Sequence, residues 1–528
     1  MQEVSKEWKD LHGRPLLNES FVEISLSMSD SVAQESATVT DNGAIYISDS
    51  TQTTEGRNNP PPLYCTLEQN IWCLDGKRTL IPESDFGDNS YVSDVLSDNT
   101  CIFNGRRPVI SITFDNPIEK LIPGITITWS KTYGEFADTF SVIAYREGGV
   151  IAEKDVILNR SVTSIVTVDI VNYDRIDIVV KKWCLPNHRA RVEEILIGLN
   201  KVYEKTDLFS YSHSNIVDPI STSLPKNEIK FSIDNVDSEY NPYNTSGLTK
   251  YLNERQEIKV RYGLKLDDKS IEWIKGGTFY LSEWYAKQNG ITADFTARDL
   301  LEFMSNIFED DITAPISRSL GVLAEKVLTS ANLPKKDGGA NRWVIHDSLY
   351  TKYTNAPLPE DTSAVCLQLI ANAAQCVLYQ DRDGIIHIEP LHTTSTDYKI
   401  NSFNSYSKSE VTLSKPIKEV KVKVYTYAND LSSTTSDVTY TVGTEGEIIT
   451  IDNPLITDVN YASSFAEWLA IYLQNRATLD SSWRADVRLD PLDIVTNTNE
   501  YSSRIVRMTD IEFNYNGAFR GTGKGKVI

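Results

Sequence analysis

The sequence lacks several features that would point to common classes of protein. No apolar run approaches the roughly 20 residues that a membrane-spanning helix needs, and the first residues lack the apolar segment of a secretory signal. The cysteines show no CxxC or Cys/His spacing typical of zinc sites; they stand at positions 65, 73, 101, 184, 366 and 376. We therefore expect synthesis in the cytoplasm, six reduced structural cysteines, no membrane span, no bound metal and no cofactor.

Motifs for catalysis are also missing. The chain contains no GxSxG, no Walker loop, no HExxH and no Cys/His arrangement for a nucleophile. The glycines at 521, 523 and 525 imitate a phosphate-binding loop, but the few residues that follow them are too short for the helix that such a loop needs. We interpret these glycines as a flexible chain end, and we expect no enzymatic activity.

Positive charge is scarce relative to negative charge. The chain has 52 Lys and Arg against 73 Asp and Glu, which gives a formal net charge of −21. Such a surface repels phosphate backbones, so nucleic-acid recognition is disfavoured. The acidic excess is explained either by solubility or by a basic partner subunit. The 26 tyrosines suit strands and hydrated interfaces, because the ring buries area while the hydroxyl stays hydrated.

A chain of 528 residues is too long for one hydrophobic core, and three or four domains are expected. Residues 63–200 contain several short segments in which apolar and polar residues alternate, for example 109–114 and 125–129. Alternation with a period of two predicts a β-sandwich with one buried face per sheet. A polar, proline-punctuated segment at residues 48–62 is typical of a boundary before this sandwich.

The second half of the chain mixes helices and strands. Residues 320–328 and 367–374 have apolar residues at helical spacing, the latter after Ser363 as an expected N-cap. The Asp-Gly step within residues 381–384 predicts a hairpin. Strands predominate again towards the C-terminus, interrupted by one helix with an apolar stripe at residues 465–472. The predicted fold class is therefore mainly β with a mixed α/β part.

A strand-rich stretch at residues 218–301 resembles the first barrel of the tail hub and baseplate proteins of phages, prophages and tail-like particles of Gram-positive bacteria. The residue runs that carry this resemblance are 218–235, 251–256, 483–486, 490–495, 516–519 and 521–525. Together they are moderately specific, and the order of barrel, mixed domain and barrel adds to them. The resemblance covers residues 1–50 and 203–528.

The resemblance implies a structural subunit with two hub-type β-barrels and an α+β domain between them. It implies a homotrimer that joins the tail tube protein to other baseplate or tip proteins, in a virion or tail-like particle made in a bacterial cytoplasm. The domains expected from it are 1–55 for the first part of barrel one, 56–202 for an insert, 203–305 for the remainder of barrel one, 306–405 for the mixed α/β domain and 406–528 for barrel two.

The insert at residues 56–202 departs from the minimal hub pattern. Its runs 91–98 and 189–195 resemble jelly-roll β-sandwiches of the discoidin and carbohydrate-binding-module type. Sugar sites need an aromatic platform for the apolar sugar face and a few polar groups for the hydroxyls. The candidate carbohydrate-binding residues lie at expected strand ends or loops, and they are Trp129, Tyr133, Trp183, His188 and Arg189.

Several alternatives stay open at this point. Trp129 and Trp183 fit core positions of the sandwich better than a sugar platform, and the Arg191–Glu193 neighbourhood fits a surface ion pair or subunit contact better than a ligand site. The insert could bind a cell-surface glycan of the host, which is the main alternative function. A calcium site near Asp85, Asp88, Asp94 and Asp98 would suit a hard cation, although the spacing matches no EF-hand. A cell-wall hydrolase is not expected, because the chain ends soon after the last barrel.

Overall fold

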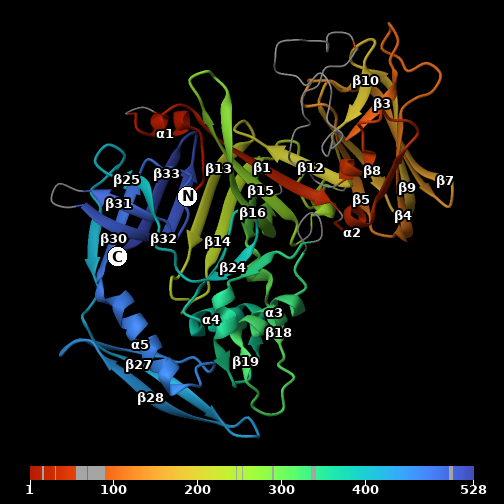
Figure 1. Cartoon of the computed structure of the whole chain (residues 1–528). Helices are drawn as coiled ribbons and strands as arrows, with labels where there is room; N and C mark the ends of the chain where they lie inside the picture. Colours follow the sequence, from red (N-terminus) through yellow and green to blue (C-terminus); the bar gives the residue numbers. More distant parts are fainter. Residues whose placement is uncertain are drawn as a thin grey trace.

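The computed structural model describes residues 1–14, 17–29, 31–54, 68, 90–244, 247–252, 254–287, 290–334, 340–498 and 503–528. Strands far outnumber helices, so the predicted mainly β class is confirmed. Figure 1 shows a long central sheet, a sandwich beside it at the upper right, and a helix-containing part below. None of the helices in the described ranges is long and apolar enough to span a bilayer.

The central sheet has thirteen strands, and both ends of the chain contribute to it. Its main path runs in the order β12-β1-β15-β16-β17-β14-β13-β32-β33-β30-β26, and β31 joins β25 to β32. The strands are β1 (Ser20–Ser29), β12 (Gly198–Tyr203), β13 (Leu208–Ile216), β14 (Lys226–Asp234), β15 (Glu257–Lys265), β16 (Ile271–Ala286), β17 (Thr292–Arg298), β25 (Ser395–Ile400), β26 (Glu410–Leu413), β30 (Ala477–Trp483), β31 (Ile494–Thr498), β32 (Ser503–Tyr515) and β33 (Phe519–Val527).

The two predicted barrels are joined in this sheet. Strand β13 pairs with β14 on one side and with β32 on the other, so Tyr211 lies between Phe231 and Tyr515. The described strands form an open path whose ends, β12 and β26, do not pair with each other. The expectation of two separate closed barrels is therefore corrected to two lobes of one open sheet, a first lobe from β12 to β13 and a second from β32 to β26 with β25 and β31.

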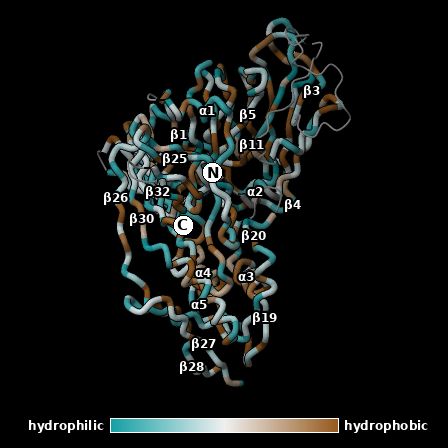
Figure 2. The backbone as a smooth tube through the Cα atoms, turned by 60° about the vertical axis from the view of Figure 1, so that its left-hand side comes forward, coloured by the Kyte–Doolittle hydropathy of each residue, from teal (hydrophilic) through white to brown (hydrophobic). Residues whose placement is uncertain are grey.

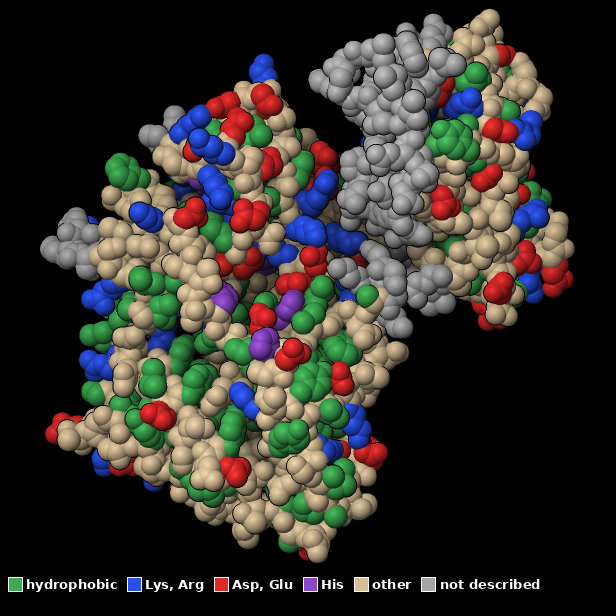
Figure 3. Space-filling view, in the orientation of Figure 1, with side chains coloured by type: hydrophobic (Ala, Val, Ile, Leu, Met, Phe, Trp, Pro, Cys, Tyr) green, Lys and Arg blue, Asp and Glu red, His purple; other side chains and the backbone are tan. Residues whose placement is uncertain are grey.

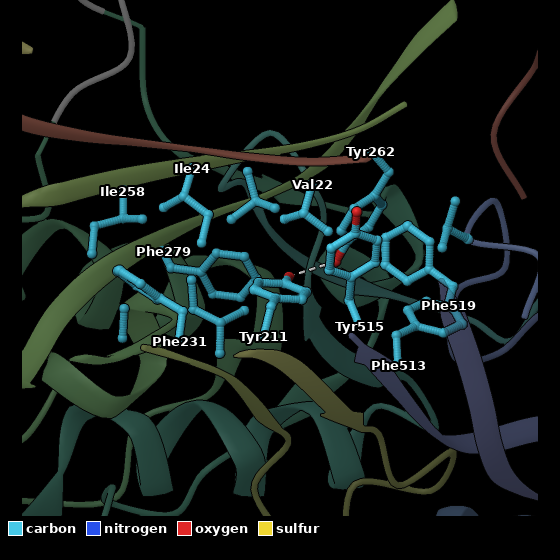
Figure 4. Packing of buried hydrophobic residues seen from close by; sticks show 14 of the residues in the cluster. Val22, Ile24, Tyr211, Phe231, Ile258, Tyr262, Phe279, Phe513, Tyr515 and Phe519 are labelled. Atoms are coloured by element: carbon cyan, nitrogen blue, oxygen red, sulfur yellow. Dashed lines mark hydrogen bonds between the residues drawn. The ribbon is translucent and has the colours of Figure 1, made fainter. Parts of the chain in front are cut away.

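Both lobes share one hydrophobic core. Tyr262 of β15 lies edge-on to Phe519 of β33, with ring centroids 5.1 Å apart, and also contacts Phe513 of β32. Figure 4 shows Tyr262, from the middle of the sequence, meeting Phe513 and Phe519 from the C-terminal strands. The short N-terminal helix α1 (Lys6–His12) buries Trp8 and Leu11 in the same core. Packing across the lobes thus fixes their relative position.

The glycines near the C-terminus are part of this core. Strand β33 alternates glycine with polar residues, and its glycine face lies under the fully buried Trp483. A Cβ on Gly521 would stand 3.0 Å from the Trp483 ring, and one on Gly523 would stand 2.3 Å from the backbone oxygen of Asp510. The interpretation of a flexible chain end was wrong, because only glycine lets β33 approach this closely.

The sandwich is built around a core of its own. A five-stranded sheet, β2-β4-β9-β6-β7, faces the three-stranded sheet β11-β5-β8, and β3 pairs with β10. The elements are α2 (Ser31–Ser36), β2 (Thr38–Asp41), η1 (Ser50–Thr54), β3 (Tyr91–Leu96), β4 (Val109–Ile118), β5 (Ile122–Thr128), β6 (Ala137–Arg146), β7 (Gly149–Val156), β8 (Thr163–Ile170), β9 (Tyr173–Trp183), β10 (Arg189–Val192) and β11 (Glu194–Leu196). Strand β2 pairs with β4, although the sequence boundary at residue 55 assigned it to barrel one.

The helix-containing part has a third core, which draws on two stretches of sequence. Its elements are η3 (Leu300–Phe303), β18 (Ile307–Phe308), β19 (Arg318–Ser319), α3 (Leu320–Ser330), β20 (Trp343–Ile345), η4 (Asp347–Thr351), β21 (Tyr353–Thr354), β22 (Asp361–Thr362), α4 (Ser363–Ala373), β23 (Val377–Gln380), β24 (Ile386–Glu389), β27 (Ile417–Tyr427), β28 (Ser433–Thr441), β29 (Glu447–Ile451) and α5 (Val459–Gln474). The predicted helices are confirmed, but the N-cap of α4 is Thr362, whose hydroxyl accepts from the Val365 N–H, and not Ser363.

Residues 417–474 belong to this third core and not to the second lobe. Val420 and Val422 of β27 and Phe465 of α5 are buried with residues of α3 and α4. Figure 2 shows the three helices close together above the β27–β28 hairpin. The region expected as barrel two, 406–528, is therefore divided between the sheet and the helix-containing part.

One arginine, Arg382, connects the helix-containing part to both lobes of the central sheet. Arg382 lies at the tip of the predicted hairpin between β23 and β24, which the structure confirms. Its guanidinium binds the Asp490 carboxylate at 2.7 Å. It also donates to three backbone oxygens, at 2.6 Å to Lys275, 2.9 Å to Val487 and 3.0 Å to Leu489. The hairpin of the helix-containing part is thereby bound to both lobes.

Candidate functional site

The residues predicted to bind sugar come from one end of the sandwich. Trp129 follows β5, Tyr133 lies in the turn closed by the Ser130–Glu135 bridge, and Trp183 ends β9. His188 and Arg189 lie where the chain enters β10. The loops therefore do bring most of these side chains together, but around a carboxylate that the sequence analysis did not single out, that of Glu135.

The two tryptophans are closed to solvent. Both have 0% exposure, and their rings pack edge to face with centroids 5.9 Å apart. The indole N–H of Trp129 donates to the Ser164 hydroxyl at 2.7 Å, and that of Trp183 donates to Glu135 Oε2 at 2.8 Å. In this arrangement neither ring offers a face to a sugar, and the core alternative describes their positions.

His188 and Glu135 form a buried pair at the same place. His188 is 2% exposed, and its Nδ1 lies 2.8 Å from Glu135 Oε1. The backbone N–H of His188 is held by the Ser97 hydroxyl at 3.1 Å. A carboxylate and an imidazole at this distance are the elements of a general acid–base pair. Both are enclosed by protein, however, so the geometry serves to anchor the loops.

Arg191 extends the pair into a buried charge network. Its Nη2 binds Glu68 at 2.5 Å, its Nη1 lies 3.6 Å from Glu135, and its guanidinium stacks 4.9 Å from the Tyr133 ring centre. Arg191 is 4% exposed, so the interpretation of its neighbourhood as a surface ion pair was wrong. Glu193 is also largely buried, and burial raises the pKa of its carboxyl. Buried charges persist only when paired and hydrogen-bonded, as here.

Arg189 and Tyr133 keep more contact with solvent than the other candidates. Arg189 Nη1 donates to the backbone oxygen of Ser93 at 2.9 Å, and its side chain remains 24% exposed. Tyr133 is half-buried. These two side chains are the part of the predicted sugar site that a ligand could reach in this arrangement, and sugar binding itself stays a prediction.

The acidic residues considered for a calcium site are engaged in other contacts where the structure describes them. Asp94 is bound to Arg106, and Asp98 accepts hydrogen bonds from the backbone of its own turn at Thr100 and Ile102. Asp85 and Asp88 lie outside the described residues. In the parts of the chain that the structure describes, no group of three or more His, Cys, Asp or Glu side chains is arranged to hold a metal ion.

The described cysteines are free thiols. Cys101 and Cys184 are partly exposed, and Cys366 and Cys376 are buried. Burial raises the pKa of the thiols of Cys184, Cys366 and Cys376 to about 11, so these groups are not thiolates near neutral pH. Cys65 and Cys73 lie outside the described residues.

A second buried polar group lies in the central sheet and is uncharged. The Tyr211 hydroxyl donates to Tyr262 at 2.7 Å, and Tyr262 donates to Nδ1 of His213 at 2.9 Å. Nε2 of His213 then donates to Asn227 Oδ1 at 2.8 Å. Burial lowers the pKa of His213 to about 4, which keeps the imidazole neutral in this chain of bonds.

The surface offers one further feature of note, an open hollow of about 300 Å³ beside the Arg382 hairpin. Its lining mixes charges of both signs with one indole, and includes Gln2, Glu3, Trp273, Lys275, Asp381 and Asp383. Lys275 is already paired with Asp383 at 2.5 Å, and Arg261 stacks over Trp273 at 5.1 Å. The hollow therefore presents groups that are largely satisfied within the protein.

The chain is similar in structure to several tail proteins. No protein-family model matches it, and no curated protein sequence matches it significantly. The 43 kDa tail protein of prophage MuSo2 from Shewanella oneidensis is 13% identical, with a TM-score of 0.43 over 62% of this chain and 95% of that one. A tail protein from Neisseria meningitidis MC58 is 12% identical, with a TM-score of 0.43 over 62% and 93%. The prophage tail protein gp18 from Listeria monocytogenes EGD-e is 13% identical, with a TM-score of 0.40 over 62% and 91%.

These values are low. Identities of 12–13% and TM-scores of 0.43 and below do not assign the chain to a family or transfer residue roles to it.

Proposed function

We propose that the chain is a structural subunit of a phage tail or tail-like particle, the hub or baseplate component that joins the tail tube to the tip and holds peripheral proteins. The observation that carries this proposal is the fusion of both chain ends into one sheet over one core. A subunit that must present two tube-like units at a constant spacing needs them fixed to each other. The β13·β32 ladder and the shared aromatic core supply that rigidity.

In this proposal the two lobes act as the two hub barrels, and three chains place six lobes in a ring. The sandwich leaves the sheet between β1 and β12, which are neighbours in the sheet, so the insertion does not disturb the ladder. The helix-containing part would face the next layer of the particle. The proposal includes no catalysis.

The test is the mass and shape of the full chain in solution. Light scattering should give about three times 59.4 kDa, and electron micrographs should show a ring with six lobes around a central opening. A monomer that persists at high concentration, or a trimer without a ring, would contradict the hub role. Release of peptidoglycan fragments by the purified protein would contradict the absence of enzymatic activity.

The glycan-binding alternative rests on Tyr133 and Arg189, the candidates that remain accessible. It is tested on the full chain, because a fragment of residues 56–202 would lack β2, which pairs with β4 of the sandwich. Binding on a glycan array that is lost in Tyr133→Ala and Arg189→Ala, but kept in the exposed control Thr167→Ala, would support it. No binding at millimolar sugar would leave the sandwich without a ligand role.

A further inference from the structure

The outer end of the long sheet is an open edge. Among the described strands, β26 pairs with β30 alone, in a regular antiparallel ladder from Glu410↔Asp480 to Leu413↔Ala477. All four of its residues are exposed. Figure 2 places β26 at the rim of the molecule beside β30. The opposite end of the sheet is different, because the Thr126 hydroxyl of the sandwich bonds to the backbone of β12 at Gly198 and Asn200.

The backbone of β26 presents unused hydrogen-bonding groups. The Ser414 N–H donates to the Arg476 oxygen at 3.0 Å, which makes this pair the hydrogen-bonded type. Because the two pair types alternate along an antiparallel ladder, the N–H and C=O of Val411 and Leu413 point away from β30. None of the hydrogen bonds between described residues outside the ladder uses these groups. An edge strand with free outward groups is a template for an added strand.

The side chains at this edge are apolar on the core-facing side. Val411 lies directly opposite Leu479, which is 2% exposed, so Val411 and Leu413 continue the buried face of the sheet. Yet Val411 is 48% exposed and Leu413 is 63% exposed. Figure 3 shows hydrophobic side chains along the left rim of the molecule, the side on which Figure 1 labels β30. The apolar face of the sheet therefore ends at β26 with its side chains uncovered by a further described strand.

The other face carries a row of charges that is unbalanced at β26. Register places Glu410 opposite Asp480, Asp480 opposite Lys524, and Lys524 opposite Asp510. Like charges directly opposite each other are unfavourable. Within the described residues, neither Glu410 nor Asp480 has an ion pair. Lys408, two residues before Glu410, already has a partner. A cation beyond Glu410 would offset the repulsion between these two neighbouring carboxylates.

These observations specify the occupant. A second copy of this chain paired through its own β26 would bring a second Glu410 to an acidic row, and the other end of the sheet is occupied by the sandwich. The fitting occupant has apolar side chains at alternate positions, facing Val411 and Leu413, and a lysine or arginine facing Glu410. The chain's net charge of −21 favours such a basic partner.

We propose that β26 is a docking edge that accepts an extended, basic segment of a different protein as a further strand of the long sheet. The proposal stands independently of the tail role, because it uses only the ladder, the exposure and the charges of β26. Affinity comes from the backbone bonds to Val411 and Leu413 and from apolar contacts, and specificity comes from Glu410.

The test uses the full chain and capped, fluorescent seven-residue peptides. The probe peptide has the sequence Thr-Val-Lys-Val-Thr-Val-Thr, and the matched peptide has Glu in place of Lys. A third peptide carries N-methyl groups on alternate amides and cannot donate. Fluorescence anisotropy should give a Kd below about 1 mM for the probe, weaker binding of the Glu peptide by about 2- to 5-fold, and no binding of the methylated peptide.

Two variants separate the edge from the rest of the surface. Val411→Pro removes an outward N–H without removing a bond to β30, and should abolish binding while thermal unfolding and oligomeric mass stay unchanged. Glu410→Lys changes an exposed side chain, and this variant should bind the Glu peptide more tightly than the Lys peptide. Binding that neither variant changes, no binding up to about 5 mM, or self-association that Val411→Pro removes would each overturn the proposal.

Discussion

The sandwich and the central sheet accommodate a buried histidine in opposite ways. Each buries a histidine whose ring nitrogens are held by other side chains. In the sandwich, His188 contacts the Glu135 carboxylate, which also faces the Arg191 guanidinium. In the sheet, the hydrogen-bond partners of His213 among the described residues are neutral, the Tyr262 hydroxyl and the Asn227 amide. One core is organised by charge and the other by a chain of neutral hydrogen bonds.

The difference teaches where each region is vulnerable. A buried ion network tolerates little loss, because removal of one charge leaves the others unpaired in a low-dielectric interior. In a neutral network, removal of one hydroxyl lowers the free energy of unfolding by less. The stability of such a network depends on the histidine staying uncharged. The sandwich should therefore respond most to substitution, and the sheet to pH.

The largest effect is expected in the sandwich. Glu135→Ala leaves His188, Arg191 and the Trp183 indole without their shared acceptor, and should lower the free energy of unfolding of the sandwich by about 3–5 kcal/mol. Glu135→Gln keeps an acceptor for the indole and should lose less than half of that. Amide hydrogen exchange should show the loss in β6 and β9 and not in β15 or β32. Equal loss in both regions would mean that the cores are not independent.

The next effect is a pH dependence confined to the sheet. The pKa of His213 is about 4 in the folded chain, below the ordinary value of 6.5, so between these pH values the unfolded chain binds more protons than the folded one. The free energy of unfolding should therefore fall as pH falls from 6.5 towards 4, by up to about 3 kcal/mol. Urea unfolding at pH 7 and pH 5 measures it. His213→Gln should remove this part of the pH dependence, and an unchanged slope would contradict it.

A smaller effect tests the close packing of the second lobe. Gly523→Ala places a Cβ 2.3 Å from the Asp510 backbone oxygen, where only backbone movement can make room. We expect a loss of about 1–3 kcal/mol in thermal or urea unfolding. Thr522→Ala, at the exposed neighbouring position of the same strand, is the control and should change stability by less than about 0.5 kcal/mol.

The smallest effect concerns the neutral chain itself. Tyr262→Phe leaves the His213 Nδ1 without a donor and the Tyr211 hydroxyl without an acceptor, and should cost about 1–2 kcal/mol. Tyr211→Phe removes only the end of the chain, because Tyr262 still donates to His213, and should cost less. If both variants lost the same amount, the direction of donation assigned to this chain would be wrong.

The sequence predicted local elements better than their assembly. The alternation in β14 and the helical spacing of α3 and α4 were sufficient to place those elements. The β13·β32 ladder joins segments some 300 residues apart, and no local pattern encodes which edge a strand will use. Strand β27 was assigned to the last barrel by proximity along the chain, but its valines pack on α5 and the core of α3 and α4.

The candidate site shows the same limit. A tryptophan at the end of a strand, such as Trp129 or Trp183, fits both a core and a sugar platform by pattern, and only the partner sheet decides between them. Glu135 follows a glycine turn and has no periodic neighbours, so nothing in the sequence distinguishes it from other acidic loop residues. The buried network could therefore not be predicted from the sequence, although four side chains close to it were among the candidate sugar-binding residues.

Through the single side chain of Arg382, the helix-containing part is hydrogen-bonded to both lobes. A mechanical force applied to the helix-containing part would act on both lobes. It would reach the first lobe through Lys275 and the second lobe through the segment from Val487 to Asp490. Neither lobe could yield alone without breaking bonds to the same guanidinium. Force entering from one side would therefore move the whole sheet as a unit rather than open the seam between its halves.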